Sequence, residues 1–123
     1  MAYVDGYIVP VRTADREAYR TAAAAFGARL IAAGALRVVE CWGDEVAHGE
    51  VTDFYRAIAA EDGETAVFSW VEWPSKAARD AGVARIESEP DPAGEPGHPA
   101  PFDGKRIVFG GFVPLFDLTA PPS

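Results

Sequence analysis

Residues 65–73 read TAVFSWVEW, and this stretch is the strongest strand signal in the chain. β-branched and aromatic residues dominate it, a Glu-Asp-Gly-Glu turn signal precedes it and a proline follows it. Side chains alternate between the faces of a sheet, which puts its large apolar residues on both faces: Phe68 and Trp70 on one, Val67, Val71 and Trp73 on the other. A sheet containing this strand therefore needs cover on both sides.

The segments on either side of this strand predict its immediate partners. Ser75 has the character of a helix N-cap, and we expect a helix from there to about Ser88. Before the strand, residues 36–42 (LRVVECW) predict a second strand and residues 44–53 a polar loop. Residues 54–60 fit a short strand and a helical turn equally well.

The first third of the chain predicts a strand followed by a helix. Residues 2–11 (AYVDGYIVPV) are typical of a strand, with Pro10 at its end or on a sheet edge. Thr13 is the expected N-cap of a helix over 14–33, whose apolar residues recur at helical spacing, and Gly34 suits its end.

The last third combines a proline-rich segment with a final strand. Residues 89–103 hold five of the ten prolines, which favours a solvated loop over an arm or flap that covers a partner or a pocket. Residues 105–118 (KRIVFGGFVPLFDL) predict a long strand, in which Gly110 and Gly111 indicate a bulge or the close approach of another backbone. We expect residues 119–123 to be frayed.

The order strand–helix–strand occurs twice, which predicts a single α+β domain over 1–123 with the ferredoxin-like βαββαβ arrangement. Its four-stranded antiparallel sheet would carry both helices on one face and leave an apolar second face. A two-fold partner is the commonest cover, so we expect two sheets to pair as a dimeric α/β-barrel. The alternative is a monomer in which 44–60 and the proline-rich segment fold back over the sheet, but these segments carry few large apolar side chains.

Composition limits the partners. The chain has 123 residues, 49% of them hydrophobic, and a net charge of −8, so we expect neither nucleic acid nor an anionic membrane surface as a partner. Cys41 is the one cysteine, the N-terminus lacks a secretory pattern, and no apolar stretch approaches membrane-spanning length. These features predict a cytoplasmic protein.

The first and second predicted strands supply the candidate catalytic carboxylates. Tyr3, Asp5 and Tyr7 share one face of the first strand. If that face lines the barrel, Asp5 lies among aromatic rings as a candidate general base, and Glu40 could join it as a second carboxylate. The favoured alternative is that Asp5 lies near a strand end and pairs with a basic residue.

Two further groups are candidates for ligand contact. Trp42, Phe68 and Trp70 offer aromatic surface for a flat ligand, although such residues more often belong to a core or an interface. Near the last strand are three charged residues that fit an anion clamp or, as we favour, a turn with ion pairs: Asp103, Lys105 and Arg106.

No metal or cofactor is predicted. Cys41 has no histidine nearby in the sequence, and His48 lies in an acidic stretch without a metal-ligand spacing. The chain has no Walker loop, dinucleotide fingerprint or nucleophile elbow.

Several motifs resemble the bacterial YbaA-like family of unknown function. They run in order along nearly the whole chain: 3–11, 39–41, 67–70, 73–75 with 79–80, 101–106 and 110–112. The resemblance implies a ferredoxin-like unit of the dimeric α/β-barrel superfamily and no established activity. Residues 89–100 depart from the family, because proline and glycine stand where Met-rich sequence is expected.

Three functions remain open. The first is a homodimer that binds a small, partly aromatic ligand in a pocket at the sheet or the dimer interface. The second, implied by the superfamily alone, is a cofactor-independent enzyme of the small monooxygenase type. The third is a structural interaction module without a ligand.

Overall fold

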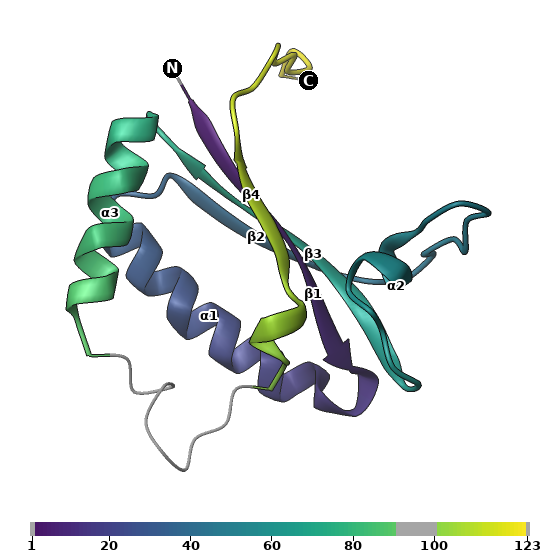
Figure 1. Ribbon diagram of the computed structural model, residues 1–123. Helices are drawn as coiled ribbons and strands as arrows, with labels where there is room; N and C mark the ends of the chain where they lie inside the picture. Colours follow the sequence, from purple (N-terminus) through teal and green to yellow (C-terminus); the bar gives the residue numbers. More distant parts are fainter. Residues whose placement is uncertain (1, 91–100, 123) are drawn as a thin grey trace.

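The fold is a four-stranded antiparallel sheet with two long helices on one face, seen in a computed structural model that describes residues 2–90 and 101–122 (Figure 1). The strand order is β2-β3-β1-β4. The strands are β1 (Tyr3–Arg12), β2 (Arg37–Trp42), β3 (Glu64–Trp73) and β4 (Val108–Phe112). The helices are α1 (Arg16–Ala32), α2 (Phe54–Ala57) and α3 (Lys76–Ser88), with 3₁₀ turns η1 (Thr13–Asp15) and η3 (Gly104–Arg106). The predicted ferredoxin-like α+β arrangement is confirmed.

The alternation predicted for residues 65–73 is confirmed. Val67, Val71 and Trp73 are 1%, 4% and 0% exposed on the face that carries α1 and α3. Phe68, on the opposite face, is 48% exposed. We call the face opposite these two helices the outer face.

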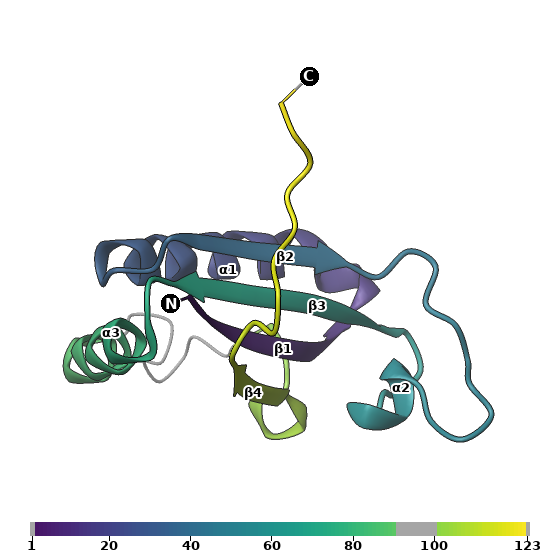
Figure 2. The same ribbon diagram turned by 90° about the horizontal axis from the view of Figure 1, so that it is seen from above.

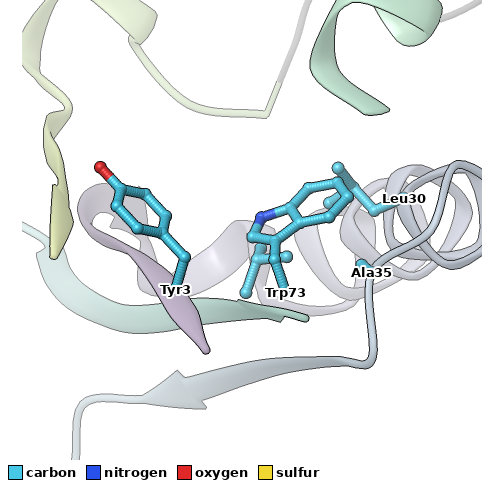
Figure 3. Close-up of a cluster of buried hydrophobic side chains, with 5 residues drawn as sticks. Tyr3, Leu30, Ala35 and Trp73 are labelled. Atoms are coloured by element: carbon cyan, nitrogen blue, oxygen red, sulfur yellow. The ribbon is translucent and has the colours of Figure 1, made fainter. Parts of the chain in front are cut away.

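The core lies between the sheet and the two long helices, around Trp73. Figure 3 shows the Trp73 indole beside Tyr3, Leu30 and Ala35. A Cβ at Gly82 of α3 would lie 2.6 Å from the Trp73 ring, so only glycine lets α3 approach this closely. The predicted cap of α3 is also present, since Ser75 Oγ accepts a hydrogen bond of 3.0 Å from the Ala78 N–H.

The start of α1 differs from the prediction. The helix begins at Arg16, and Thr13 opens the preceding 3₁₀ turn instead of capping α1. The Thr13 hydroxyl donates to the Gly63 carbonyl at 3.3 Å, which ties this turn to the start of β3. Gly34, with φ of 114°, ends α1 as predicted.

Pro10 lies inside a long strand yet satisfies the edge rule. It pairs with Ala66 of β3 and is buried. β1 pairs with β4 only from Val4 to Ile8, so at Pro10 the strand has a partner on one side alone.

Residues 54–57 resolve the ambiguous segment as the helical turn α2. Asp53 caps it, because its carboxylate accepts the Arg56 N–H at 2.8 Å. Phe54 contacts Phe68 edge-on at 6.2 Å between ring centroids, so α2 lies on the outer face. Figure 2 places it beside the first part of β3 only.

The predicted long strand over 105–118 is wrong at both ends, because β4 spans only Val108–Phe112. At its start, Asp103 caps the η3 turn by accepting the Lys105 N–H at 3.0 Å. At its end, Phe112 pairs with Val4, and β1 begins one residue earlier. Beyond Phe112 only Tyr3 of β1 is left to pair with, and Pro114 lacks the N–H that a ladder needs.

The prediction for Gly110 and Gly111 is also corrected. Their register with β1 is regular, without a bulge. The close neighbours of Gly111 are side chains instead of another backbone: a Cβ there would collide with the Tyr3 hydroxyl and lie 2.8 Å from Arg79. The glycine thus leaves room for that pair of side chains. Residues 91–100 of the predicted proline-rich loop lie outside the described residues.

Candidate ligand site between α1 and β2

A hollow of about 680 Å³ lies between α1 and the edge strand β2. Its α1 wall is a stripe of residues at helical spacing, half of which are small and leave the gap unfilled: Arg16, Tyr19, Arg20, Ala23, Ala24, Gly27, Ala28 and Ile31. Its sheet wall consists of Val38, Glu40, Trp42 and Val67. We call this space the α1–β2 hollow.

The contacts between the α1 wall and the β2 wall change in character along the length of the hollow, and each such position is called a level. At one end, the Arg16 guanidinium lies 5.4 Å from the centre of the Trp42 ring. At the other end, a Cβ on Gly27 would be 3.4 Å from Val38. The hollow therefore has a basic, aromatic end and an apolar end.

Tyr19 and Glu40 form the middle level. The Tyr19 hydroxyl donates to Glu40 Oε1 at 2.5 Å. Glu40 as a residue is exposed, but its carboxyl lies under Tyr19, and burial there raises its pKa while hydrogen bonds from Tyr19 and Ser69 lower it. Burial, and then the bond to Glu40, raise the pKa of Tyr19. Phe102 holds the Tyr19 ring edge-on at 5.7 Å. The pair provides a fixed acceptor that can also carry a proton.

The two arginines at the basic end have N–H donors that are available to bind an anion. Among residues 2–90 and 101–122, no carboxylate lies within ion-pair distance of Arg16. Arg20 contacts Glu17 at 3.7 Å, and both side chains are more than three-quarters exposed. Such an exposed pair contributes little, so Arg20 can bind another anion at low cost.

The structure brings three of the predicted residues together elsewhere, on β1 beneath α3. Asp5 Oδ2 accepts the Trp73 indole N–H at 3.0 Å, and Asp5 Oδ1 lies 3.7 Å from Arg79 Nε. Arg79 also donates to the Tyr3 hydroxyl at 2.8 Å and lies 4.7 Å above its ring. Tyr7 is on the same face, where burial, and then the charge of Asp5, raise its pKa to about 12. Asp5 is thus held by a basic residue near a strand end, as in the favoured interpretation.

The two candidate catalytic carboxylates lie apart. Glu40 pairs with Ser69 on β3, and Ser69 pairs with Tyr7 on β1. Asp5 is on β1, so two strand spacings of about 5 Å each separate its strand from that of Glu40. Each carboxylate has its own partners, and they do not form one site.

The predicted aromatic residues also divide between two faces. Trp42 is on the helix-bearing face and lines the hollow. Phe68 and Trp70 are on the outer face, with ring centroids 5.8 Å apart. They therefore contribute to different surfaces.

Arg106 forms ion pairs with carboxylates of the same chain. It donates to Glu64 through two nitrogens, at 2.7 and 2.8 Å, and to Asp103 at 3.0 Å. Lys105 is exposed at the same turn. This is the ion-paired turn favoured from the sequence, and a ligand role for these residues stays a prediction.

The α1 half of the hollow was not foreseen from the sequence. Tyr19 fitted the buried stripe of an amphipathic helix, and Arg16 and Arg20 fitted its solvated face. A usable signal is the run of alanines and glycine one turn further on, because small residues on a packed face leave space.

Within 2–90 and 101–122, no group of three or more His, Cys, Asp or Glu residues could hold a metal ion. No helix in the same residues is long and apolar enough to cross a membrane.

Comparison with solved structures defines the class of protein first. A structure described as a dimeric ferredoxin-like protein from an uncultured marine organism matches with a TM-score of 0.56 at 11% identity, covering 96% of this chain and 100% of that chain. At this identity the likeness shows the fold alone. The chain is an α+β protein of the ferredoxin-like class.

The family follows from sequence. Residues 2–104 match the family described as "Protein of unknown function (DUF1428)", and the chain belongs to this family. It is 47% identical over 117 residues to the uncharacterized protein YbaA of Escherichia coli K12, covering 95% of this chain and 99% of that protein. YbaA of Shigella flexneri matches equally well. The predicted family resemblance is confirmed.

Proposed function

We propose that this protein acts as a homodimer, formed through the outer faces of two sheets, that binds a small, partly aromatic molecule. The observation that carries the dimer is the outer face itself. Three of its apolar side chains are strongly exposed: Phe112 at 60%, Phe68 at 48% and Val108 at 41%.

The outer face is apolar through its middle and charged only near its ends. The central residues come from all four strands: Val4, Ile8, Val39, Phe68, Trp70, Val108 and Phe112. Among the described residues, α2 covers only the end where β3 begins. Burying such surface is favourable by about 25 cal/mol per Å² of apolar area, and a second copy offers the matching face.

The C-terminal arm, residues 113–118, gives further support. Four of its side chains are apolar and exposed by 61–95%: Val113, Leu115, Phe116 and Leu118. Figure 1 and Figure 2 show this segment extending beyond the end of β4, away from the rest of the fold. An apolar segment of this kind gains most by packing on a partner chain. The solved structure of the same fold is described as dimeric, which also favours this assembly.

The α1–β2 hollow is the observation that supports the proposed ligand binding. Its volume of about 680 Å³ is within the usual range for small-molecule sites. It combines an apolar wall with a few polar groups, which is the common composition of such sites. We place the protein in the cytoplasm, because its one cysteine, Cys41, is free and exposed.

An enzyme is the second candidate, and Glu40 is the observation that favours it. A carboxyl whose pKa is raised by burial suits general acid–base catalysis. An enzyme would convert a bound molecule and lose turnover in Glu40→Gln, whereas a binding protein would release the molecule unchanged.

The dimer is tested with two substitutions on one strand. Phe112→Glu puts a charge on the outer face, and Phe109→Glu, at 74% exposure, puts the same charge on the helix-bearing face of β4. In sedimentation velocity we expect the wild type and Phe109→Glu to be dimers and Phe112→Glu to be a monomer. A monomeric wild type, or a dimer that Phe112→Glu leaves intact, would count against the outer-face interface.

A further inference from the structure

We infer that the α1–β2 hollow is a site for aromatic carboxylates, with the carboxylate at Arg16 and Arg20 and the ring between Trp42 and the small residues of α1. This inference rests on the proposed ligand binding and specifies the class of ligand. It concerns a surface on the helix-bearing side of β2, away from the outer face.

The anionic group follows from the arginines. The protein has a net charge of −8, yet among the described residues Arg16 lies beside no carboxylate. Its guanidinium carbon lies over the Trp42 ring instead, 5.4 Å from the ring centre, and a ring face uses none of the N–H donors that can bind two oxygens of one carboxylate. Arg20 is one helical turn further along the same wall.

The flat ring follows from the shape of the walls. Because Ala23, Ala24 and Ala28 have short side chains, the α1 wall is smooth, and the Trp42 indole makes the β2 wall planar. At the far end the walls are close, since a Cβ on Gly27 would lie 3.4 Å from Val38. A space between a smooth helix wall and an indole suits a planar molecule better than a branched aliphatic one.

The Tyr19–Glu40 pair adds a second polar anchor. Arg16 lies over Trp42, and Glu40 is two residues from Trp42 on β2, so about 7 Å of strand separates the level of Glu40 from that of Trp42 and Arg16. That is about the span from a carboxylate to the para substituent of a benzene ring. A para hydroxyl can therefore donate to Glu40 while the carboxylate lies at Arg16, so the site should prefer 4-hydroxybenzoate to benzoate.

The test is a titration of the full-length, ¹⁵N-labelled protein followed by amide NMR shifts. The probes are 4-hydroxybenzoate, benzoate, the neutral 4-hydroxybenzyl alcohol and the aliphatic butyrate. We expect saturable shifts in α1 and β2 from the two aromatic acids, with affinities at least about ten-fold weaker for the alcohol and butyrate.

Three variants locate the binding. Arg16→Gln should weaken the binding of 4-hydroxybenzoate about ten-fold. Arg12→Gln, which changes an exposed arginine outside the hollow, should leave the affinity unchanged. Ala28→Phe should fill the apolar end and block binding, and because residue 28 is exposed the fold should survive, as the dispersion of the amide spectrum will show.

Three results would overturn the inference. Equal affinity for the alcohol and the acid, or for Arg16→Gln and the wild type, would leave a ligand site but remove the carboxylate class. An absence of shifts from both aromatic acids at millimolar concentration would remove the class as well. The proposed dimer is judged separately, from sedimentation, so the two failures can be told apart.

Discussion

At the scale of single residues, the Glu64–Arg106 pair fixes how the chain enters β4. The two oxygens of Glu64 accept two Arg106 donors, and the side chains are only 7% and 18% exposed. Arg106 also donates to the Ala59 carbonyl at 3.1 Å. One guanidinium thus joins η3, the start of β3 and the end of the α2 segment.

Glu64→Gln should therefore destabilise the protein in a pH-dependent way. Arg106 lowers the pKa of Glu64, so the stabilisation is complete above the ordinary glutamate pKa and is lost as pH falls through the lower folded value. We expect a loss of about 2 kcal/mol in the free energy of unfolding near pH 7, measured by urea denaturation, and this loss should shrink as pH falls below the ordinary glutamate pKa. Glu61→Gln, 3.9 Å from Arg106 and 74% exposed, is the matched control and should change little. A loss that persists unchanged at low pH would mean that Glu64 acts through packing and not through its charge.

At the scale of elements, the C-terminal arm is apolar and yet strongly exposed. Leu115 is 95% and Phe116 77% exposed. Nothing within the described residues covers these apolar side chains, and the proposed second copy would cover them.

The double change Leu115→Ser and Phe116→Ser should weaken the dimer while the fold is retained. Both side chains are exposed, so thermal unfolding of dilute, monomeric protein should shift little, whereas the dimer dissociation constant should rise at least about ten-fold. The control is Val51→Ser, at 91% exposure in the loop before α2. Unchanged dimerisation in the arm variant would exclude the arm from the interface.

Elements with strong local signals could be predicted from the sequence, and elements that depend on distant partners could not. The alternation of β3 and the Ser75 cap of α3 are local signals, and Pro74 marks the boundary between the two elements. β4 ends at Phe112 because its partner Val4 is already the second residue of β1, and this register depends on a distant strand. The α1 boundary shifted because Thr13 bonds to Gly63, fifty residues away.

The same reasoning explains how much of the candidate site could be found. Glu40 and Trp42 were recognised because an ionisable group and an indole stand out in a strand. Their separation from Asp5, Phe68 and Trp70 depends on which face and which strand each residue occupies, and alternation alone does not give the register that decides this. Tyr19 joins Glu40 only because α1 packs across β2.

At the scale of the whole molecule, the two faces of the sheet differ in what covers them. One face is covered by α1 and α3 and contains the core, with the α1–β2 hollow at its edge. The other face is open over much of its area and continues into the C-terminal arm. A homodimer through that open face, with one hollow on each chain turned away from the interface, accounts for both surfaces.

The most direct test of this account is native mass spectrometry on gently purified, untagged protein. The account predicts one main species at twice 13.1 kDa, and a ligand retained in the hollow would add a few hundred daltons per site. A main species at 13.1 kDa across micromolar concentrations would contradict it, because the outer face would then meet water without a partner.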